Sequence, residues 1–423
     1  MASGMESPET THETGHKASD KPAHKAGRVP TRLRLARLGV LLIFFVNGAT
    51  FASLVPRYPE IIERLHVSNT LWGLALGIGP IGGIALGWLA APLMRRYRSR
   101  NVAALAQIAS SGALVILALA GTIEWVFVAM FAMSAFDAVT DTSMNYHGLR
   151  VQRLYRRSIF NSFHGWWCIG AVVGGFLGSA AAGAAMAVPT QTYLTVGVLL
   201  CCVVASWAMM LPGEDREQVA GTEVATGRAW LRPRTLAVLV GLGLLGALVG
   251  GIELGGSAWS PLYMTDQFAA TPFVAGLGFV ALMVFETLGR LTGDVLVDRL
   301  GLVRTVVWGA VACLAGMALA LAVPTPVTAL IGFGASGWGI ATMIPNAMNA
   351  ADGLPGVPAG VGLTITTWVM RVGFVLFPIV IGALGDAVSL RLALLVIPLS
   401  AVLIMALSPL LRPRPAPQAT ATG

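Results

Sequence analysis

Three polar side chains recur at four-residue intervals inside a long apolar stretch, and they are the strongest candidates for chemistry. They are Asp137, Asp141 and Asn145, and on a helix this spacing places them along one face. Ionisable groups at membrane depth usually face a water-filled cavity or the interior of a helix bundle. A carboxyl group that loses its water holds its proton more tightly, so changing access to water can load and release the proton. We therefore predict that Asp141 and Asp137 carry protons; the alternative is that they brace their helix against the arginine-rich loop that follows.

Other polar groups within apolar stretches are candidates to line a substrate cavity. His164 has the chemistry to relay protons or to hydrogen-bond a substrate, and it has equally the character of a core histidine. Arg371 lies deep in its stretch and needs an anion beside it, either a carboxylate of the protein or an anionic substrate. Glu253 lies among glycines toward the outer end of its stretch, where a substrate contact or a gate is expected. The predicted cavity residues are Asn47, Asn145, His164, Glu253, Asn346, Asn349 and Arg371.

Two of these interpretations have structural alternatives. The asparagines have the same chemistry for hydrogen bonds between helices as for a substrate. Four tryptophans are candidates to stack on a ligand, and interfacial anchoring is their common alternative role. These are Trp166, Trp167, Trp259 and Trp368.

The composition indicates which elements position these residues. Of the 423 residues, 56% are apolar and only 11% are charged, whereas soluble domains carry about a quarter charged residues. Twelve apolar stretches are each about 20 residues long, as membrane-spanning helices require, and the alternating strands of about ten residues found in membrane barrels do not occur. We predict an all-α membrane protein with twelve transmembrane helices in two pseudo-symmetric six-helix halves. The spans are Leu38–Val55, Leu71–Ala91, Val102–Gly121, Trp125–Tyr146, Ser162–Met186, Tyr193–Leu211, Thr235–Ser257, Pro272–Thr292, Val303–Val323, Val327–Ala351, Gly360–Leu384 and Leu390–Leu411.

The positive charges predict the orientation of the chain. Lysines and arginines gather in alternate loops, as the positive-inside rule requires, and this placement accounts for the net charge of +8 without nucleic-acid binding. We expect a multi-pass protein of the cytoplasmic membrane with both termini cytoplasmic, working in the lipid bilayer as a monomer. The predicted parts are a disordered tail (1–36), a first half (37–211), a cytoplasmic linker (212–234), a second half (235–411) and a second tail (412–423).

The two halves repeat a sequence pattern, and the chain resembles the major facilitator superfamily over its whole span-containing length. The stretch Gly289–Gly301, GRLTGDVLVDRLG, is similar to the signature loop between helices eight and nine of that superfamily, and Gly87–Arg100 is a degenerate copy in the first half. Met144-Asn145 ends the fourth span, and Met348-Asn349 ends the tenth in the same way. Parallel repeats of this kind place the substrate site near the bilayer midplane between the halves.

Two stretches resemble the fucose-permease-like branch of the superfamily. One is Ser53–Pro59, SLVPRYP, and the other is Asp141–Asn145, DTSMN. In that branch the acidic residue of the second pattern is implicated in proton coupling, which the resemblance carries over to Asp141. The first helix has Ala52 where the branch has an acidic residue.

A ladder of charges follows the eighth span. Glu286, Arg290 and Asp294 are spaced at i, i+4 and i+8, with Glu before Arg as a helix favours. In the superfamily such a ladder latches the cytoplasmic side in one conformational state. We predict that these residues, with Asp298 and Arg299, form a conformational latch and do not bind substrate.

Together these features predict a secondary active transporter that moves a small solute and protons by alternating access. The resemblance favours proton-coupled symport of a sugar-like or other small polar metabolite; the alternative is proton-coupled efflux of drugs or metabolites. A membrane receptor would need a signalling domain, and a membrane enzyme would need a clustered nucleophile, metal ligands or a phosphate-binding motif. We expect no enzyme activity, no cofactor and no metal site, since no GxxxxGK[ST] motif occurs and the four cysteines lie within apolar spans.

Overall fold

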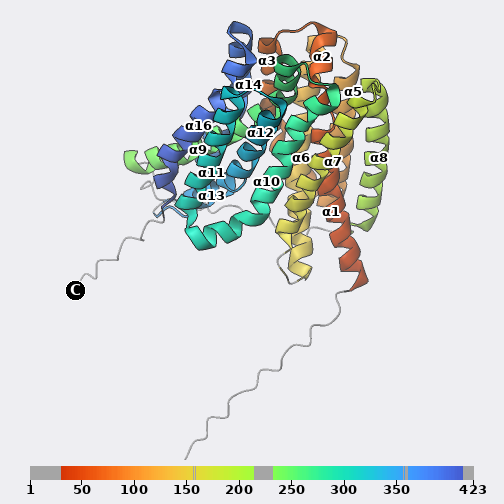
Figure 1. The fold of residues 1–423 in the computed structure, drawn as a ribbon. Helices are drawn as coiled ribbons and strands as arrows, with labels where there is room; N and C mark the ends of the chain where they lie inside the picture. Colours follow the sequence, from red (N-terminus) through yellow and green to blue (C-terminus); the bar gives the residue numbers. More distant parts are fainter. Residues whose placement is uncertain are drawn as a thin grey trace, which may run out of the picture.

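The computed structural model describes residues 30–155, 157, 159–213, 232–355, 357 and 361–412. These residues form helices and short connections, and no strand occurs among them. Twelve of the helical segments are long and apolar enough to cross a membrane. The predicted all-α membrane fold with twelve spans is therefore confirmed (Figure 1).

The helices follow one another through two groups of six spans. The first group contains α1 (Thr31–Ala52), η1 (Val55–Arg57), α2 (Tyr58–Leu65), α3 (Asn69–Gly87), α4 (Ala90–Tyr97), α5 (Ser99–Leu119), α6 (Ile123–Tyr155), α7 (Phe160–Gly183) and α8 (Val188–Met209). The second contains α9 (Pro233–Phe268), α10 (Pro272–Leu300), α11 (Leu302–Ala322), α12 (Pro326–Ile340), α13 (Met343–Asp352), α14 (Val361–Ala387), α15 (Leu390–Ala393), α16 (Val396–Leu407) and η3 (Ser408–Leu411).

Several helices extend beyond the predicted spans. Helix α6 continues to Tyr155 and α9 to Phe268, while α1 begins at Thr31, inside the predicted first tail. An apolar stretch marks the part that suits a membrane, whereas a helix continues through polar residues while its backbone hydrogen bonds can be made. Most of the predicted linker and tails lies outside the described residues.

The predicted tenth span is broken. Helix α12 ends at Ile340 and α13 begins at Met343. Pro345 stands near the start of α13 and has no backbone N–H to donate back to the carbonyl of Ala341, four residues earlier. A proline is tolerated in the first turn of a helix, so the chain ends one helix and starts another at this point.

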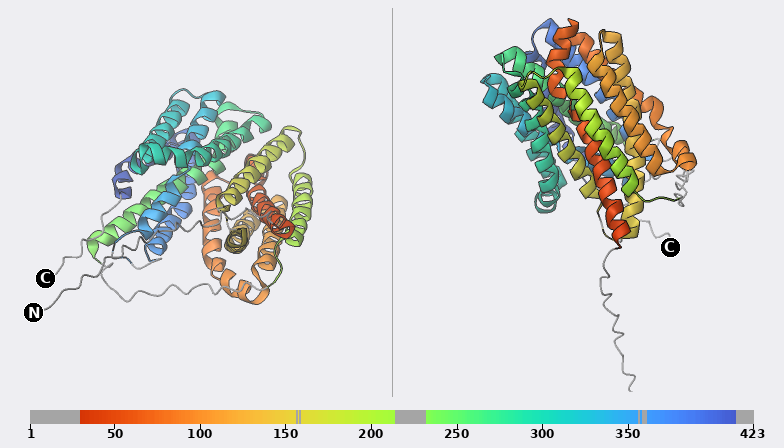
Figure 2. Two further views of the ribbon diagram at one scale, coloured as in Figure 1. Left: turned by 90° about the horizontal axis from the view of Figure 1, so that it is seen from below. Right: turned by 90° about the vertical axis from the view of Figure 1, so that its right-hand side faces the viewer.

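The two groups of spans form two bodies that lie side by side. The left panel of Figure 2 separates the first half, red to lime, from the second half, green to blue. The most extensive contacts between the halves are those of α3 with α14 and of α7 with α10. Glycines allow the first pair to approach closely: a Cβ on Gly73 would overlap the Pro378 carbonyl, and a Cβ on Gly382 would overlap the Asn69 carbonyl.

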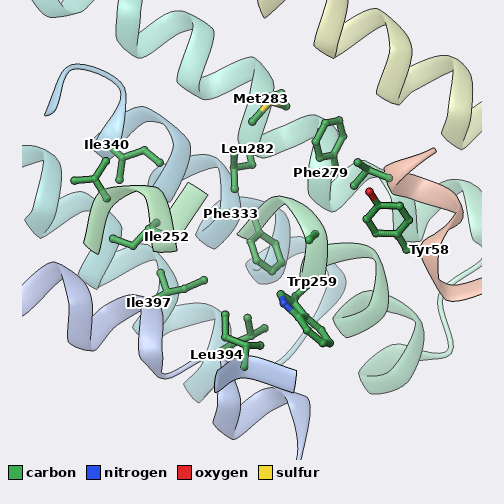
Figure 3. Packing of buried hydrophobic residues seen from close by; sticks show 14 of the residues in the cluster. Tyr58, Ile252, Trp259, Phe279, Leu282, Met283, Phe333, Ile340, Leu394 and Ile397 are labelled. Carbon is green, nitrogen blue, oxygen red and sulfur yellow. The ribbon is translucent and has the colours of Figure 1, made fainter. Parts of the chain in front are cut away.

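The contacts between α7 and α10 lie on the same side of the molecule. A Cβ on Gly276 would overlap the hydroxyl of Ser179, and the rings of Phe176 and Phe273 pack edge to face at 6.1 Å. A buried apolar cluster continues this closure, with Tyr58 of the first half beside Phe279 of the second (Figure 3). The joined segments are the starts of α3 and α10 and the ends of α7 and α14, so the halves are closed on the side away from the described chain ends.

Packing near the opposite side stays within each half. Helix α6 packs mainly against α3 and α5, and α13 packs against α9 and α14. Asp141, in the second half of α6, is exposed. The halves are therefore held together on one side, while the Asp141 side chain, toward the other side, is exposed.

Candidate functional site

A hydrogen-bond network centred on Asn47 connects four helices of the first half. The Asn47 amide of α1 donates to the Gln107 side chain of α5 at 3.0 Å and to the Asp137 carboxylate of α6 at 2.7 Å. Its oxygen accepts from the Trp167 indole of α7 at 2.7 Å. An amide group has two N–H donors, and here both are used. Because Asn47 is only 4% exposed, these bonds fix Asp137 from inside the helix bundle.

Part of this network was not anticipated from the sequence. Gln107 donates to the Thr50 hydroxyl at 3.0 Å, and both side chains are buried. Gln107 is the one amide side chain in its predicted span, Val102–Gly121, and this is the signal that the sequence offers. Trp167 was expected to stack on a ligand or anchor at the interface; in the structure its indole N–H bonds Asn47, and its ring stacks on Phe51 at 6.0 Å.

Asp141 lies one turn beyond Asp137 in a different environment. Its carboxylate accepts a hydrogen bond from the Asn145 amide at 2.8 Å, within the same helix, and Asp141 is exposed. Neither Asp137 nor Asp141 forms an ion pair with an arginine in the described part of the chain. The arrangement pairs a fixed carboxylate, Asp137, with an exposed one, Asp141, four residues apart.

A second charged group lies where the halves meet. Glu286 and Arg290 of α10 form an ion pair, and Glu286 is only 3% exposed. The Arg290 guanidinium also donates to the Cys168 thiol of α7, with 3.2 Å between nitrogen and sulfur. Glu253 of α9 is half-buried and lies close enough for its charge to act on Glu286 and Arg290. This group therefore joins α9 and α10 of the second half to α7 of the first.

The rest of the predicted ladder is not assembled in this conformation. Asp294 is exposed and forms no ion pair with Arg290, and Asp298 and Arg299 are exposed near the end of α10. Arg290 instead turns toward Glu286 and Cys168, away from Asp294. Helix α9 continues well beyond Glu253, to Phe268, so Glu253 lies further from the end of its helix than the predicted span implies.

The remaining predicted cavity residues are dispersed. His164 lies edge-on to the rings of Phe44 and Phe160, each at 5.2 Å, and hydrogen-bonds none of the described residues. Asn346 donates to the Thr342 carbonyl of its own helix turn at 2.8 Å, and Asn349 is exposed. The structure thus brings Asn47 to Asp137 and Asn145 to Asp141, but it uses Asn346 locally.

Arg371 is half-buried in α14 and has no ion-pair partner among the described residues. It lies on the same helix face as Val375 and Pro378, whose backbone carbonyls touch α3. Because Arg371 lies beyond those contacts, it faces the region where the halves diverge. The expected carboxylate partner is therefore not seen.

Two polar contacts that the sequence did not reveal hold the closed side. Arg57 is 2% exposed, donates to the Gln191 side chain at 3.0 Å and the Met186 carbonyl at 2.6 Å, and pairs with Glu60 at 2.6 Å. No local pattern around Arg57 indicated these partners, because Gln191 and Met186 lie in another span and its preceding connection. Arg57 therefore ties the end of the first span to the start of the sixth.

The second of these contacts crosses between the halves. Asp386, at the end of α14, caps the start of α3 by accepting from the backbone N–H groups of Asn69 at 3.0 Å and Thr70 at 2.7 Å. It also accepts from the Thr70 hydroxyl at 2.6 Å. The first N–H groups of a helix have no partner within the helix and favour a carboxylate. Here the carboxylate comes from the other half.

No group of three or more potential metal ligands occurs in the described residues. The side chains described above offer carboxyl, amide, guanidinium and thiol groups. These groups suit proton binding and hydrogen bonding to a polar solute.

Comparison with known proteins gives a consistent family. The sequence profile of the Major Facilitator Superfamily matches residues 40–265 and 245–423. An uncharacterised MFS-type transporter of Yersinia pestis is 26% identical over 83% of this chain and 89% of its own length. The membrane protein MosC of Rhizobium meliloti is 26% identical over 86% of this chain and 87% of its own length.

Solved structures share the fold. The nucleoside transporter NupG superposes with a TM-score of 0.70 at 16% identity, over 91% of this chain and 100% of that chain. A bacterial homologue of the human lysosomal transporter Spinster, in an inward-facing and unoccupied conformation, gives a TM-score of 0.69 at 13% identity. That alignment covers 91% of this chain and 99% of the homologue.

Proposed function

Since the chain belongs to the major facilitator superfamily, whose members carry small solutes across membranes and are not enzymes, we propose that it couples the movement of a small polar solute to protons by alternating access. We place it in the cytoplasmic membrane with both termini cytoplasmic. In that orientation the structure corresponds to an inward-facing state, because the closed side is the one away from the chain ends.

The pairing of Asp137 and Asp141 carries this proposal. Asp137 is fixed by Asn47, and Asp141 is exposed; we propose that water reaches Asp141 from the side where the halves diverge. When the halves close on that side, Asp141 loses water and its neutral form is favoured; when water returns, ionisation is favoured again. A proton is then exchanged in step with alternating access, provided the two states differ in affinity for it.

The cavity residues support a polar solute. Asn145 accompanies Asp141, while Asn349 and Arg371, which pairs with no acid among the described residues, offer further polar groups. We propose uptake by symport, in line with the resemblance of Ser53–Pro59 and Asp141–Asn145 to the fucose-permease-like branch. Efflux is the second candidate, because the first helix lacks the acidic residue of that branch and has Ala52.

A transport screen in proteoliposomes tests the function. Purified protein is reconstituted, a proton gradient of either sign is imposed, and radiolabelled sugars, polyols and amphipathic drugs are offered in turn. Symport predicts that a polar solute accumulates on the alkaline side and that a proton ionophore abolishes the accumulation. Accumulation of an amphipathic drug on the acidic side would establish efflux instead, and accumulation unaffected by the ionophore would exclude proton coupling.

A further inference from the structure

Two glutamates, Glu253 and Glu286, lie on the helices α9 and α10, which pack together along a seam. The helices run antiparallel and are in close contact at two places: a Cβ on Gly278 would lie 3.0 Å from the Ser260 side chain, and a Cβ on Gly256 would overlap Leu282. On α9, Glu253 comes one turn before Gly256 on the face that includes Ser260; on α10, Glu286 comes one turn after Leu282. Continuing the seam by one turn therefore places the two glutamates opposite each other.

The packing around this position supports that placement. Ile252, beside Glu253, and Leu282 belong to one buried cluster (Figure 3). Glu286 is covered from a third side by α12, where a Cβ on Gly337 would come within 3.1 Å of the Glu286 backbone nitrogen. Helix α12 carries no ionisable side chain. Apart from the two glutamates, the titratable groups facing the site are Arg290 of α10 and, next to it on α7, Cys168 and His164.

The hydrogen bonding at this seam is incomplete. Oε1 of Glu286 accepts from Arg290, but its buried Oε2 has no hydrogen-bond partner among the described residues. Glu253 also makes no hydrogen bond within the described part of the chain. A buried carboxylate oxygen without a donor is costly, and two facing carboxylates with one arginine leave an uncompensated negative charge.

We propose that Glu253 and Glu286 form a proton-binding site in the second half, in which one proton is held by Glu253 and donated to Oε2 of Glu286. The proton comes from water: the Glu253 carboxylate takes it from a hydronium ion, water is released, and no group is oxidised or reduced. One proton satisfies the unpartnered oxygen and leaves Glu286 and Arg290 as a neutral pair. The site is separate from Asp137 and Asp141, which lie in the first half.

Arg290 gives this site a mechanical consequence. With the proton bound, Arg290 pairs with one carboxylate and can also donate to Cys168 of α7. When the proton leaves, two carboxylates compete for Arg290, so its bond across the halves weakens. Proton binding by Glu253 and Glu286 does not require Asp141 to bind the transported proton. Its effect on solute movement rests on the proposed transport function.

Infrared difference spectroscopy on the full-length protein in lipid nanodiscs tests the site without a substrate. Spectra at acid and alkaline pH are subtracted, and the carbonyl stretch of protonated carboxyl groups is followed. We expect a band that disappears at alkaline pH in the wild type, is missing in Glu253→Gln, shifts in Glu286→Gln and persists in Asp141→Asn. Glu286→Gln keeps a side-chain oxygen that can accept a hydrogen bond from the Glu253 O–H. If Glu253→Gln does not fold, the shift of the band in Glu286→Gln still tests the site.

Two outcomes would overturn the proposal. The first is that folded Glu253→Gln and folded Glu286→Gln both show the same carboxyl bands as the wild type. The wild-type bands would then come from other carboxyl groups, and no proton would be bound between Glu253 and Glu286. The second is loss of the wild-type band at acid pH on adding sodium but not potassium, because the site would then bind a metal cation in place of a proton. In either case a gradient-driven transport assay would still show whether Asp141 is needed for accumulation of the solute. Failure of the glutamate site can therefore be distinguished from failure of the proposed transport function.

Discussion

Asn47 is the residue on which the polar interior of the first half depends. Its side chain joins Gln107, Asp137 and Trp167, which come from three different helices. Replacing one partner of a buried hydrogen bond leaves the others unsatisfied, at about 1–3 kcal/mol for each group left without a partner. The stability of this half should therefore be sensitive to changes at this position.

We predict that Asn47→Ala lowers the free energy of unfolding by at least about 1–3 kcal/mol. Asn145→Ala is the matched control, because its amide bonds only to Asp141 within the same helix. Thermal unfolding of both variants in detergent measures the difference. If the two variants lost equal stability, the network around Asn47 would not be the stabilising feature described above.

Individual residues also show what the sequence can and cannot predict. The spacing of Asp137, Asp141 and Asn145 predicted a shared helix face, and the Asp141–Asn145 bond follows from that spacing alone. The bonds of Arg57 and Asp386 could not be predicted in this way. The exception is the Arg57–Glu60 ion pair, which joins residues three apart. The other partners are distant in sequence and are backbone groups, an amide and a hydroxyl without a distinctive pattern. Such contacts exist only once the helices are packed.

At the scale of elements, Asp386 makes the start of α3 dependent on α14. A helix cap contributes about 1 kcal/mol, and this one is present only while the halves are closed on that side. Opening the halves on this side must break the cap. Removing the cap should therefore favour the state that is open on this side. A change of about 1 kcal/mol alters the ratio of two states by roughly fivefold.

We therefore predict that Asp386→Ala increases labelling of a reporter cysteine at Ile379 by roughly fivefold, since Ile379 packs against Gly77 in the closed contact. Thr325→Ala is the control: Thr325 caps α12, and both lie in the second half. The rates of thiol labelling are compared in a background in which the native cysteines have been replaced. Equal rates in the two variants would show that the Asp386 cap does not hold the halves together.

Arg290 is the corresponding link between α10 and α7. Arg290→Ala removes the bond to Cys168 and leaves Glu286 buried without its cation. We expect altered accessibility of the two sides with solute recognition largely retained, measured by thiol labelling and by equilibrium exchange. Arg290→Lys keeps the charge but not the planar guanidinium, so a partial effect is expected. Loss of solute binding with unchanged accessibility would contradict the role of Arg290 as a conformational link.

Helix ends show where sequence patterns reach their limit. The apolar stretches located all twelve spans, because burial in lipid needs long apolar helices. They did not locate the end of α6 at Tyr155 or the break between Ile340 and Met343. The positions of these helix ends depend on backbone hydrogen bonding and on Pro345. The hydrophobicity of the sequence does not report either of them.

For the whole molecule, the distribution of positive charge predicts which side of the membrane the chain ends lie on, whereas the fold alone does not. We predict that a single cysteine at Thr122, between α5 and α6, is labelled in intact cells by a membrane-impermeant reagent. A cysteine at Arg96, in α4 just before the start of α5, should be labelled only after the cells are permeabilised. Both positions are exposed. The opposite pattern would place the termini outside and turn the proposed inward-facing state into an outward-facing one.

The conformational state was beyond sequence prediction. The repeated motifs indicated two halves with a site between them, but closure depends on glycines that meet carbonyls across the halves, such as Gly73 with Pro378. Glycines of this kind are spread through most spans. Which of them meet in a given state depends on the packing of the halves, and the same sequence has to support more than one packing.

The central claim is that Asp141 binds the proton that drives transport. Asp141→Asn keeps the size and hydrogen bonding of the side chain but removes its titration. In proteoliposomes with an imposed proton gradient, using the solute identified by the screen, we predict that this variant loses accumulation and retains exchange of internal for external solute. A folded Asp141→Asn protein that still accumulates solute against its gradient would contradict the claim.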